Sequence, residues 1–322
     1  MWNLQEQERI PISCYTEDPF WVEIQSYLPV ENRLTRSTLP NEYFLTIGDL
    51  KIHIDHYKPL SPRGRVILFH GVGGNGRLLS FLALPLMKNG FEVICPDMPL
   101  YGYSSYSKTV TYQTWVLSGT EIVKNLQRDS ALPTFLFGLS AGGMLAYQIA
   151  NEYNQINGLI VTCLLDQREK AVTISTAANR YLGMLAKPFL SVAKIFAGNV
   201  KVPMKWVSNM KAIANNDELV SLLMKDKKSS GAMIPLIFLH SMLNPIIKIE
   251  PENFRDCPIL LLHPGEDRWT NIKLSNLFYD RLATKKKTVI LDGAGHFPIE
   301  RSGLKQMEAA CIEFIEQHLN TK

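Results

Sequence analysis

Apolar and polar positions follow two alternating patterns from about residue 43 onward. Short apolar runs predict strands at residues 65–70, 91–95, 134–137, 159–165, 259–263 and 288–291, and the nearly continuous run at 65–70 suits a strand buried on both faces. Between them, spacings of three and four predict helices that end at Met87 and that cover residues 114–126, 141–152 and 271–282, with a last helix from Leu304 to Leu319. Strands separated by helices predict an α/β fold with a mostly parallel sheet covered on both faces.

Three other regions depart from this alternation. Residues 45–47 and 51–56 flank Gly48-Asp49 and predict an antiparallel hairpin. Residues 166–256 contain helix-like apolar stretches at 182–197 and 233–243, broken by prolines, and predict an inserted helical subdomain. Residues 1–42 form a leader whose aromatic residues, Phe20, Trp21 and Tyr27, predict that it packs on the body. The core is therefore expected at residues 43–165 and 257–322.

Composition narrows the class of protein. The chain has 322 residues, 46% of them hydrophobic and 20% charged, which is typical of a folded globular protein. The net charge of +4 is spread thinly, so no nucleic-acid partner is expected. Five widely spaced cysteines predict reduced thiols without a metal site. The polar start and the lack of a long apolar run predict a cytoplasmic protein without a transmembrane segment.

The strongest chemical signal is Gly138-Leu139-Ser140-Ala141-Gly142, between a predicted strand and a predicted helix. A tight strand-to-helix turn needs small neighbours, exposes the serine hydroxyl, and directs the amide N–H of Ala141 toward a developing oxyanion. Because a serine hydroxyl is a weak nucleophile until a base removes its proton, the motif requires a partner. The sequence therefore predicts Ser140 as a nucleophile.

A base and an acid for Ser140 are found further along the chain. His296 lies in a glycine-lined loop just after the last predicted strand, where a base would meet the serine. Asp267 follows the strand at 259–263 and gives the chain order serine, acid, histidine. Asp166, at the end of another predicted strand, is the rival acid, and Glu266 is a weaker one.

These motifs together resemble the α/β-hydrolase family, in particular its lipase- and esterase-like branch with monoacylglycerol-lipase-type proteins. His70-Gly71-Val72-Gly73-Gly74 resembles the family's oxyanion loop, and residues 96–104 resemble its D-x-P-G-x-G-x-S loop, with Leu100 replacing a glycine. The resemblance implies a Ser140-His296-Asp267 triad, an oxyanion hole of the Val72 and Ala141 amides, and a structural His70. It also implies that residues 166–256 form a cap and that no cofactor is needed.

Other functions also fit parts of the sequence. Gly71 to Gly76 fits G-x-G-x-x-G and Asp97 ends the next strand, as in NAD-dependent oxidoreductases, but that reading leaves the three triad loops unexplained. The same fold also serves cofactor-free haloperoxidases, C–C bond hydrolases and non-catalytic ligand receptors. The aliphatic residues of the insertion favour a small-molecule carboxylic ester with an apolar acyl chain. The pattern leaves the oligomeric state open.

Overall fold

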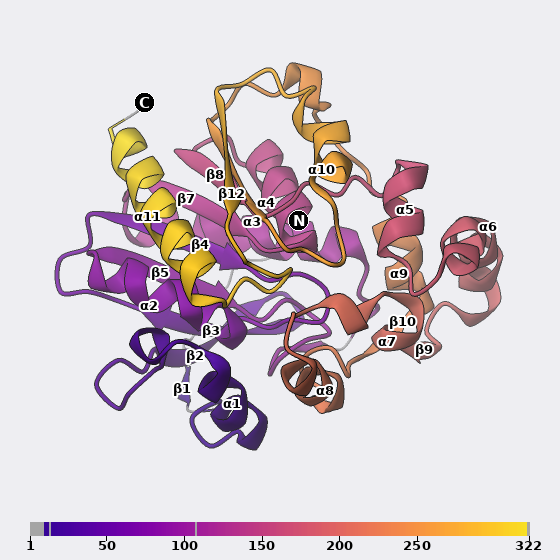
Figure 1. The fold of residues 1–322 in the computed structure, drawn as a ribbon, viewed down its shortest axis with the longest axis horizontal. Helices are drawn as coiled ribbons and strands as arrows, with labels where there is room; N and C mark the ends of the chain where they lie inside the picture. The colour runs from indigo at the N-terminus through magenta and orange to yellow at the C-terminus, as the bar shows by residue number, and fades with distance from the viewer. Residues whose placement is uncertain (1–9, 13, 107, 321–322) are drawn as a thin grey trace.

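The computed structural model describes residues 10–12, 14–106 and 108–320 and centres on one ten-stranded sheet (Figure 1). Its strand order is β1-β2-β3-β5-β4-β7-β8-β11-β12, with β6 paired to β3. The strands are β1 (Ile10–Ile12), β2 (Asn41–Ile47), β3 (Leu50–Tyr57), β4 (Gly64–Phe69), β5 (Phe91–Pro96), β6 (Ser105–Tyr106), β7 (Thr134–Gly138), β8 (Gly158–Val161), β11 (Ile259–Pro264) and β12 (Lys286–Leu291). The six strands from β5 to β12 in this order are parallel, as the sequence predicts.

Helices cover both faces of the sheet. The α2 and α11 helices pack together on one face, and α3 and α4 pack together on the other (Figure 1). The helices that accompany the sheet are α1 (Pro19–Ile24), η1 (Gln25–Tyr27), η2 (Val30–Asn32), η3 (Arg77–Leu79), α2 (Ser80–Lys88), α3 (Tyr112–Asp129), α4 (Ala141–Glu152), α10 (Ile272–Tyr279) and α11 (Arg301–His318). Strands β4, β5, β7 and β11 are buried along their whole length, which explains their continuous apolar runs.

Between β8 and β11 the chain leaves the sheet and forms a group of helices at one end of the molecule (Figure 1). Its elements are α5 (Lys170–Thr176), α6 (Arg180–Ala197), β9 (Lys201–Pro203), α7 (Met204–Val207), η4 (Met210–Ala212), α8 (Asp217–Lys225), β10 (Met233–Pro235), α9 (Leu236–Leu243) and η5 (Pro251–Asn253). The α6 helix packs against α5 and α9. No helix in the described residues is long and apolar enough to cross a membrane.

Two of the predicted elements are wrong in extent. The helix expected at 233–243 starts only at Leu236, because residues 233–235 pair antiparallel with β9. The strand expected at 159–165 ends at Val161, where its pairing with β11 ends. The Thr162 amide still donates to the Gly138 carbonyl, but the Leu164 amide donates to the Ser275 hydroxyl of α10 instead of to a strand. Apolar runs alone do not distinguish these endings.

Candidate active site

Ser140 stands on the turn between β7 and α4. Its backbone has φ 55° and ψ −125°, a left-handed conformation that costs energy for a residue with a side chain. The Ser140 amide donates to the Thr162 hydroxyl at 2.9 Å, which holds the strained turn from the neighbouring strand end. A Cβ on Gly138 would collide with the Gly142 carbonyl, so only glycine fits before the turn. The strained backbone of Ser140 and the glycine at position 138 together allow the turn to present the serine hydroxyl.

His296 and Asp267 complete a hydrogen-bonded chain with Ser140. The Ser140 Oγ lies 2.8 Å from His296 Nε2, and His296 Nδ1 lies 2.8 Å from Asp267 Oδ2. Both Ser140 and His296 are buried, and only 2% of the Asp267 side chain is exposed. The three residues follow β7, β11 and β12, whose carboxyl ends meet at one edge of the sheet. The structure thus brings together all three residues that the sequence predicts.

Asp267 is held as a carboxylate by several donors. Burial by itself raises the pKa of Asp267, but the hydrogen bond and charge of His296 and the donors of Thr270 outweigh it and lower the pKa. The amides of Trp269 and Thr270 donate to Asp267 Oδ1 at 2.7 and 2.8 Å, and the Thr270 hydroxyl donates to Oδ2 at 2.8 Å. An ionised acid in this place orients the imidazole and stabilises its cation.

Val72 and Ala141, the predicted oxyanion-hole residues, lie close to Ser140. Ala141 is the first residue of α4, so its N–H has no partner within the helix. Val72, Ser140 and Ala141 line the same cavity. A Cβ on Gly71 would lie 2.9 Å from the Ser140 Cβ, so glycine lets the two loops approach. This arrangement suits two amide donors that stabilise an oxyanion.

His70 fixes the direction of the Val72 amide. His70 is fully buried, and burial lowers its pKa, so the ring is neutral. Its Nε2 accepts from the Met98 amide at 2.9 Å, so its Nδ1–H donates to the Gly71 carbonyl at 2.7 Å. Because the peptide bond is planar, holding that carbonyl also orients the N–H of Val72. His70 is therefore a structural residue at the site, as the resemblance implies.

The rival acids lie elsewhere. Asp166 pairs with Arg168 at 2.8 Å, and Glu266 is exposed. Asp97, the acid of the dinucleotide alternative, is fully buried and accepts from the amides of Gly76 and Tyr103, so it is not available to bind a ribose. Sequence reasoning missed Thr162, Trp269 and Thr270. The spacing D-x-x-T from Asp267 to Thr270 is the one local signal that pointed to the carboxylate's donors.

A cavity of about 620 Å³ lies beside Ser140. Residues of the sheet domain and of the helices between β8 and β11 line it. Its walls are apolar and include Leu165, Leu236, Leu239, Met242 and Leu243. The polar lining side chains are amides, hydroxyls and the Trp269 indole, and none of the lining residues is charged. The cavity can accept an uncharged, largely apolar group next to the serine.

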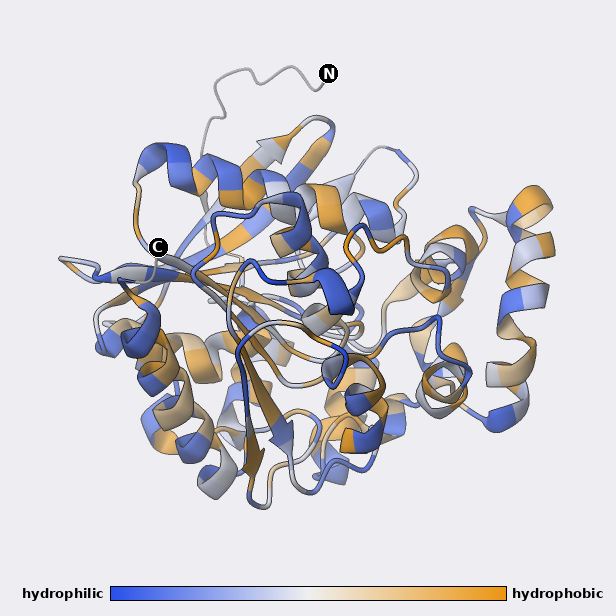
Figure 2. Cartoon of the chain, turned by 90° about the horizontal axis from the view of Figure 1, so that it is seen from above, coloured by the Kyte–Doolittle hydropathy of each residue, from blue (hydrophilic) through white to orange (hydrophobic). Residues whose placement is uncertain are grey.

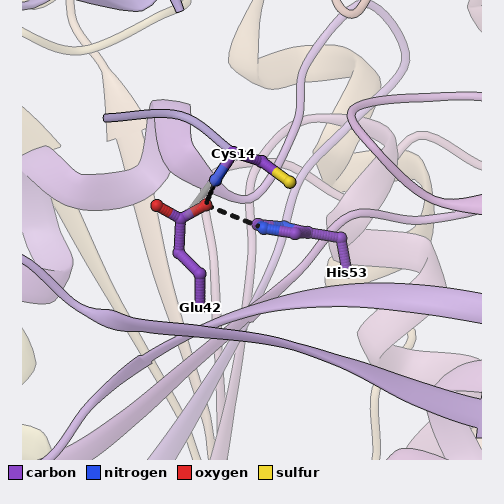
Figure 3. A group of neighbouring side chains, drawn as sticks. All are labelled: Cys14, Glu42 and His53. Carbon is purple, nitrogen blue, oxygen red and sulfur yellow. Dashed lines mark hydrogen bonds and ion pairs between the residues drawn. The ribbon is translucent and has the colours of Figure 1, made fainter. Parts of the chain in front are cut away.

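A second polar group, Cys14, Glu42 and His53, has ligand atoms within 4.8 Å of one another (Figure 3). The Glu42 oxygens are already engaged: they accept from the Cys14 amide at 2.8 Å, lie 3.0 Å from His53 Nε2 and pair with Arg77 at 3.0 Å. Burial lowers the pKa of His53, but Asp97 and Glu42 raise it to about 12, so His53 is a cation. Two buried cations disfavour a metal ion, and the group is a buried ion-pair cluster.

The sequence model of a family described as "Serine aminopeptidase, S33" matches residues 60–299. No curated protein matches the sequence. Several solved structures share the fold. A soluble variant of monoglyceride lipase from Saccharomyces cerevisiae, solved with a substrate analog, is 18% identical with a TM-score of 0.73, over 89% of this chain and 98% of that chain.

Two further structures are similar. Monoacylglycerol lipase from Paleococcus ferrophilus is 18% identical with a TM-score of 0.62, over 83% of this chain and 99% of that chain. A thermostable carboxyl esterase from Bacillus coagulans, solved with glycerol, is 19% identical with a TM-score of 0.62, over 87% of this chain and 98% of that chain. At these identities the similarity shows the fold alone.

Proposed function

Since the chain belongs to the serine aminopeptidase S33 family and has the α/β-hydrolase fold, it is a hydrolase, and we propose that it cleaves carboxylic esters with Ser140 as the nucleophile. The observation that carries this proposal is the hydrogen-bond chain from Ser140 through His296 to Asp267, with 2.8 Å at each step. The bound ester would place its carbonyl oxygen between the amides of Val72 and Ala141.

The first half of the reaction forms an acyl-enzyme. Ser140 Oγ attacks the ester carbonyl carbon while His296 Nε2 takes its proton, and Asp267 stabilises the imidazolium through Nδ1–H. The amides of Val72 and Ala141 donate to the oxyanion of the tetrahedral intermediate. When the intermediate collapses, the bond to the alcohol oxygen breaks and His296 returns the proton to the leaving alcohol.

The second half regenerates the enzyme. Water takes the place of the alcohol, His296 removes one of its protons, and the hydroxide oxygen attacks the acyl carbon. A second tetrahedral intermediate forms in the same oxyanion hole and then releases the carboxylic acid. The proton held by His296 returns to Ser140 Oγ, so the free serine is restored.

The cavity supports an apolar acyl group, as in a monoacylglycerol or another small ester. Each methylene that an acyl chain buries against the uncharged, aliphatic lining stabilises the bound ester by about 0.8 kcal/mol. An aminopeptidase must bind a charged α-ammonium group, and burying a cation without a carboxylate partner is costly. No carboxylate lines this cavity among the described residues. This favours an ester over a peptide substrate.

The helices between β8 and β11 act in this proposal as a cap over the site. Leu182, Leu185 and Phe189 of α6 and Leu239 and Leu243 of α9 line the cavity that also touches Ser140. In the same proposal the leader holds the sheet edge and the cap: the Asp18 carboxylate lies 2.8 Å from Lys228 Nζ and accepts from the Tyr103 hydroxyl at 2.7 Å.

Hydrolysis of p-nitrophenyl esters from acetyl to octanoyl tests this function. We expect kcat/KM to rise a few-fold per added carbon until the cavity is full, because each methylene leaves water. Ser140→Ala should lower turnover by roughly 10³-fold or more. Alanine p-nitroanilide, an aminopeptidase substrate, should be turned over far more slowly than the best ester.

Each contrary result has a separate meaning. Rates that fall steadily from the acetyl ester upward would contradict the apolar acyl pocket but leave the triad in place. Faster cleavage of alanine p-nitroanilide than of every ester would contradict the ester proposal. No turnover of any ester, together with tight binding of one, would indicate a ligand receptor on the same fold.

A further inference from the structure

Exposed apolar side chains gather on the outer side of α6 and the segment that follows it. Of the nineteen large hydrophobic residues that are exposed in the described chain, ten lie between Tyr181 and Trp206. In Figure 1 α6 lies at one edge of the molecule, and Figure 2 shows apolar residues along the helix at that edge. A patch of this kind on a folded protein marks an interaction surface.

The α6 helix has two apolar faces of different character. The inner face, which packs against α5 and α9, uses small residues together with one leucine: Gly183, Ala186, Leu190, Ala193 and Ala197. The outer face carries large residues at helical spacing, and each is between 62% and 86% exposed: Leu185, Phe189, Val192, Ile195 and Phe196. We define these five residues as the α6 outer face. Core packing explains the inner face but leaves the outer one without a partner.

The charge around the outer face has a single sign. Residues 170–216 contain no aspartate or glutamate and seven cations: Lys170, Arg180, Lys187, Lys194, Lys201, Lys205 and Lys211. The whole chain carries +4, so the rest of the chain is net negative by three. None of the seven cations forms an ion pair with a carboxylate of the described residues. The positive charge of the chain is therefore concentrated in the segment that contains α6 and its exposed apolar residues.

We propose that the α6 outer face docks onto the surface of a bilayer that contains anionic phospholipids. A helix with bulky apolar residues on one side and lysines around them is suited to lie in the lipid interface, with its apolar side among the acyl chains. The lysines are attracted to negatively charged headgroups, each strengthening binding about fivefold. The cavity adjoins this face, because Leu185 and Phe189 belong both to its lining and to the α6 outer face. An apolar ligand dissolved in the bilayer would reach the cavity without crossing water.

Vesicle co-sedimentation of the full chain tests this docking and does not depend on catalysis. We expect binding to vesicles of phosphatidylcholine with 30% phosphatidylserine, and weaker binding to phosphatidylcholine alone. Raising the salt concentration to 0.5 M should weaken binding to the anionic vesicles, because salt screens charges at a surface. The variant Ile195→Ser/Phe196→Ser, whose residues do not line the cavity, should lose at least tenfold in affinity.

Matched variants separate the patch from general surface properties. Val30→Ser/Leu60→Ser removes two other exposed apolar residues and should bind like the wild type. Lys194→Gln/Lys205→Gln should weaken binding to anionic vesicles about 25-fold, whereas Lys227→Gln/Lys285→Gln, exposed elsewhere, should weaken it less than threefold. Circular dichroism and hydrolysis of a short soluble ester by all four variants should match the wild type, which shows that they are folded.

Three outcomes would overturn the proposal. One is the absence of binding to anionic vesicles at low salt. Another is equal loss of binding in the α6 variants and in their matched controls. The third is a dimer in sedimentation without lipid that Ile195→Ser/Phe196→Ser converts to a monomer, which would show that a second copy of the chain covers the patch.

Discussion

Two residues with side chains adopt the left-handed backbone conformation in the described chain: Ser140 at the candidate site and Leu100 in the loop after β5, whose Met98 amide donates to His70. Ser140 has φ 55° and Leu100 has φ 87°. The strain at Ser140 follows from the turn that presents the hydroxyl. In the loop after β5, Leu100 stands where the α/β-hydrolase loop pattern has a glycine. Its backbone is therefore strained, and its side chain packs against the core. Local energy is therefore stored in the loops that shape the site.

Replacing Leu100 separates its strain from its packing. Leu100→Ala loses the packed side chain but keeps the strain, whereas Leu100→Gly loses the side chain and relieves the strain. We expect Leu100→Gly to have the higher free energy of unfolding, by about 1 kcal/mol, in urea titrations. Glycine is ordinarily the less stable of the two by about 0.5–1 kcal/mol. An alanine variant at least as stable as the glycine variant would show that position 100 carries no strain.

Asp267 and Asp166 offer a paired test of the acid. Asp267→Asn should keep the fold but lower kcat on the order of 10⁴-fold, because an amide no longer stabilises the imidazolium. Asp166→Asn should change kcat less than tenfold, since Asp166 pairs with Arg168 and not with His296. Steady-state kinetics on one ester measures both variants. The reverse order of effects would assign the acid to the end of β8.

Among the elements, the inner parallel strands and their helices were predicted because burial on both faces leaves an uninterrupted apolar run in β4, β5, β7 and β11. The edge strand β12 is mostly exposed and was recognised from residues 288–291 alone. Sequence periodicity did not predict β1, β6, β9 or β10, which are two or three residues long and lack a pattern of their own. The site residues on strand ends followed from the order of the elements. Their supporting donors, such as Thr162 on the neighbouring strand, depend on tertiary contacts that spacing does not encode.

The ion-pair cluster around Glu42 joins β2, β3 and the leader and should make stability depend on pH. Burial raises the pKa of Glu42, but His53, Arg77 and the Tyr15 and Cys14 amides lower it from 4.5 to about 2. Its stabilising contribution is therefore present above pH 4.5 and lost as the pH falls toward 2. Because the pKa of His53 is about 12, His53 stays charged throughout this range.

Urea unfolding at several pH values measures this effect. The free energy of unfolding of the wild type should fall from pH 4.5 to pH 2, and Glu42→Gln should show a shallower fall. Burial raises the pKa of Glu92, but His56 and Arg65 lower it to about 2. Glu92 therefore also contributes to the fall in the free energy of unfolding, and Glu42→Gln retains that contribution. An equally steep fall in the wild type and in Glu42→Gln would show that Glu42 does not carry the dependence.

At the scale of the whole molecule, the sheet domain supplies the triad and the helices between β8 and β11 supply most of the cavity wall. The positive excess lies within that insertion, in residues 170–216, and the rest of the chain is net negative. In the proposed function, the insertion that would select a substrate is also the part that would meet a lipid surface. We therefore expect the insertion to determine selectivity and the sheet domain to carry out the chemistry.

Narrowing the cavity from the insertion side should change selectivity and not chemistry. Val207 lines the cavity, and Val207→Trp should lower kcat/KM for the octanoyl ester by at least about tenfold, since several methylenes worth about 0.8 kcal/mol each lose their place. The acetyl ester should react within threefold of the wild-type rate. Val200→Trp, exposed and outside the lining, is the control and should leave both rates unchanged. Equal losses for both esters would argue against an acyl chain in this cavity.

Labelling with a fluorophosphonate shows whether Ser140 is the nucleophile. Mass spectrometry of the labelled protein should show one adduct, and peptide mapping should assign it to Ser140. Ser140→Ala should take up no label, and Asp267→Asn should react much more slowly than the wild type. An adduct on another residue, or ester hydrolysis by protein whose Ser140 stays unlabelled, would show that Ser140 is not the nucleophile.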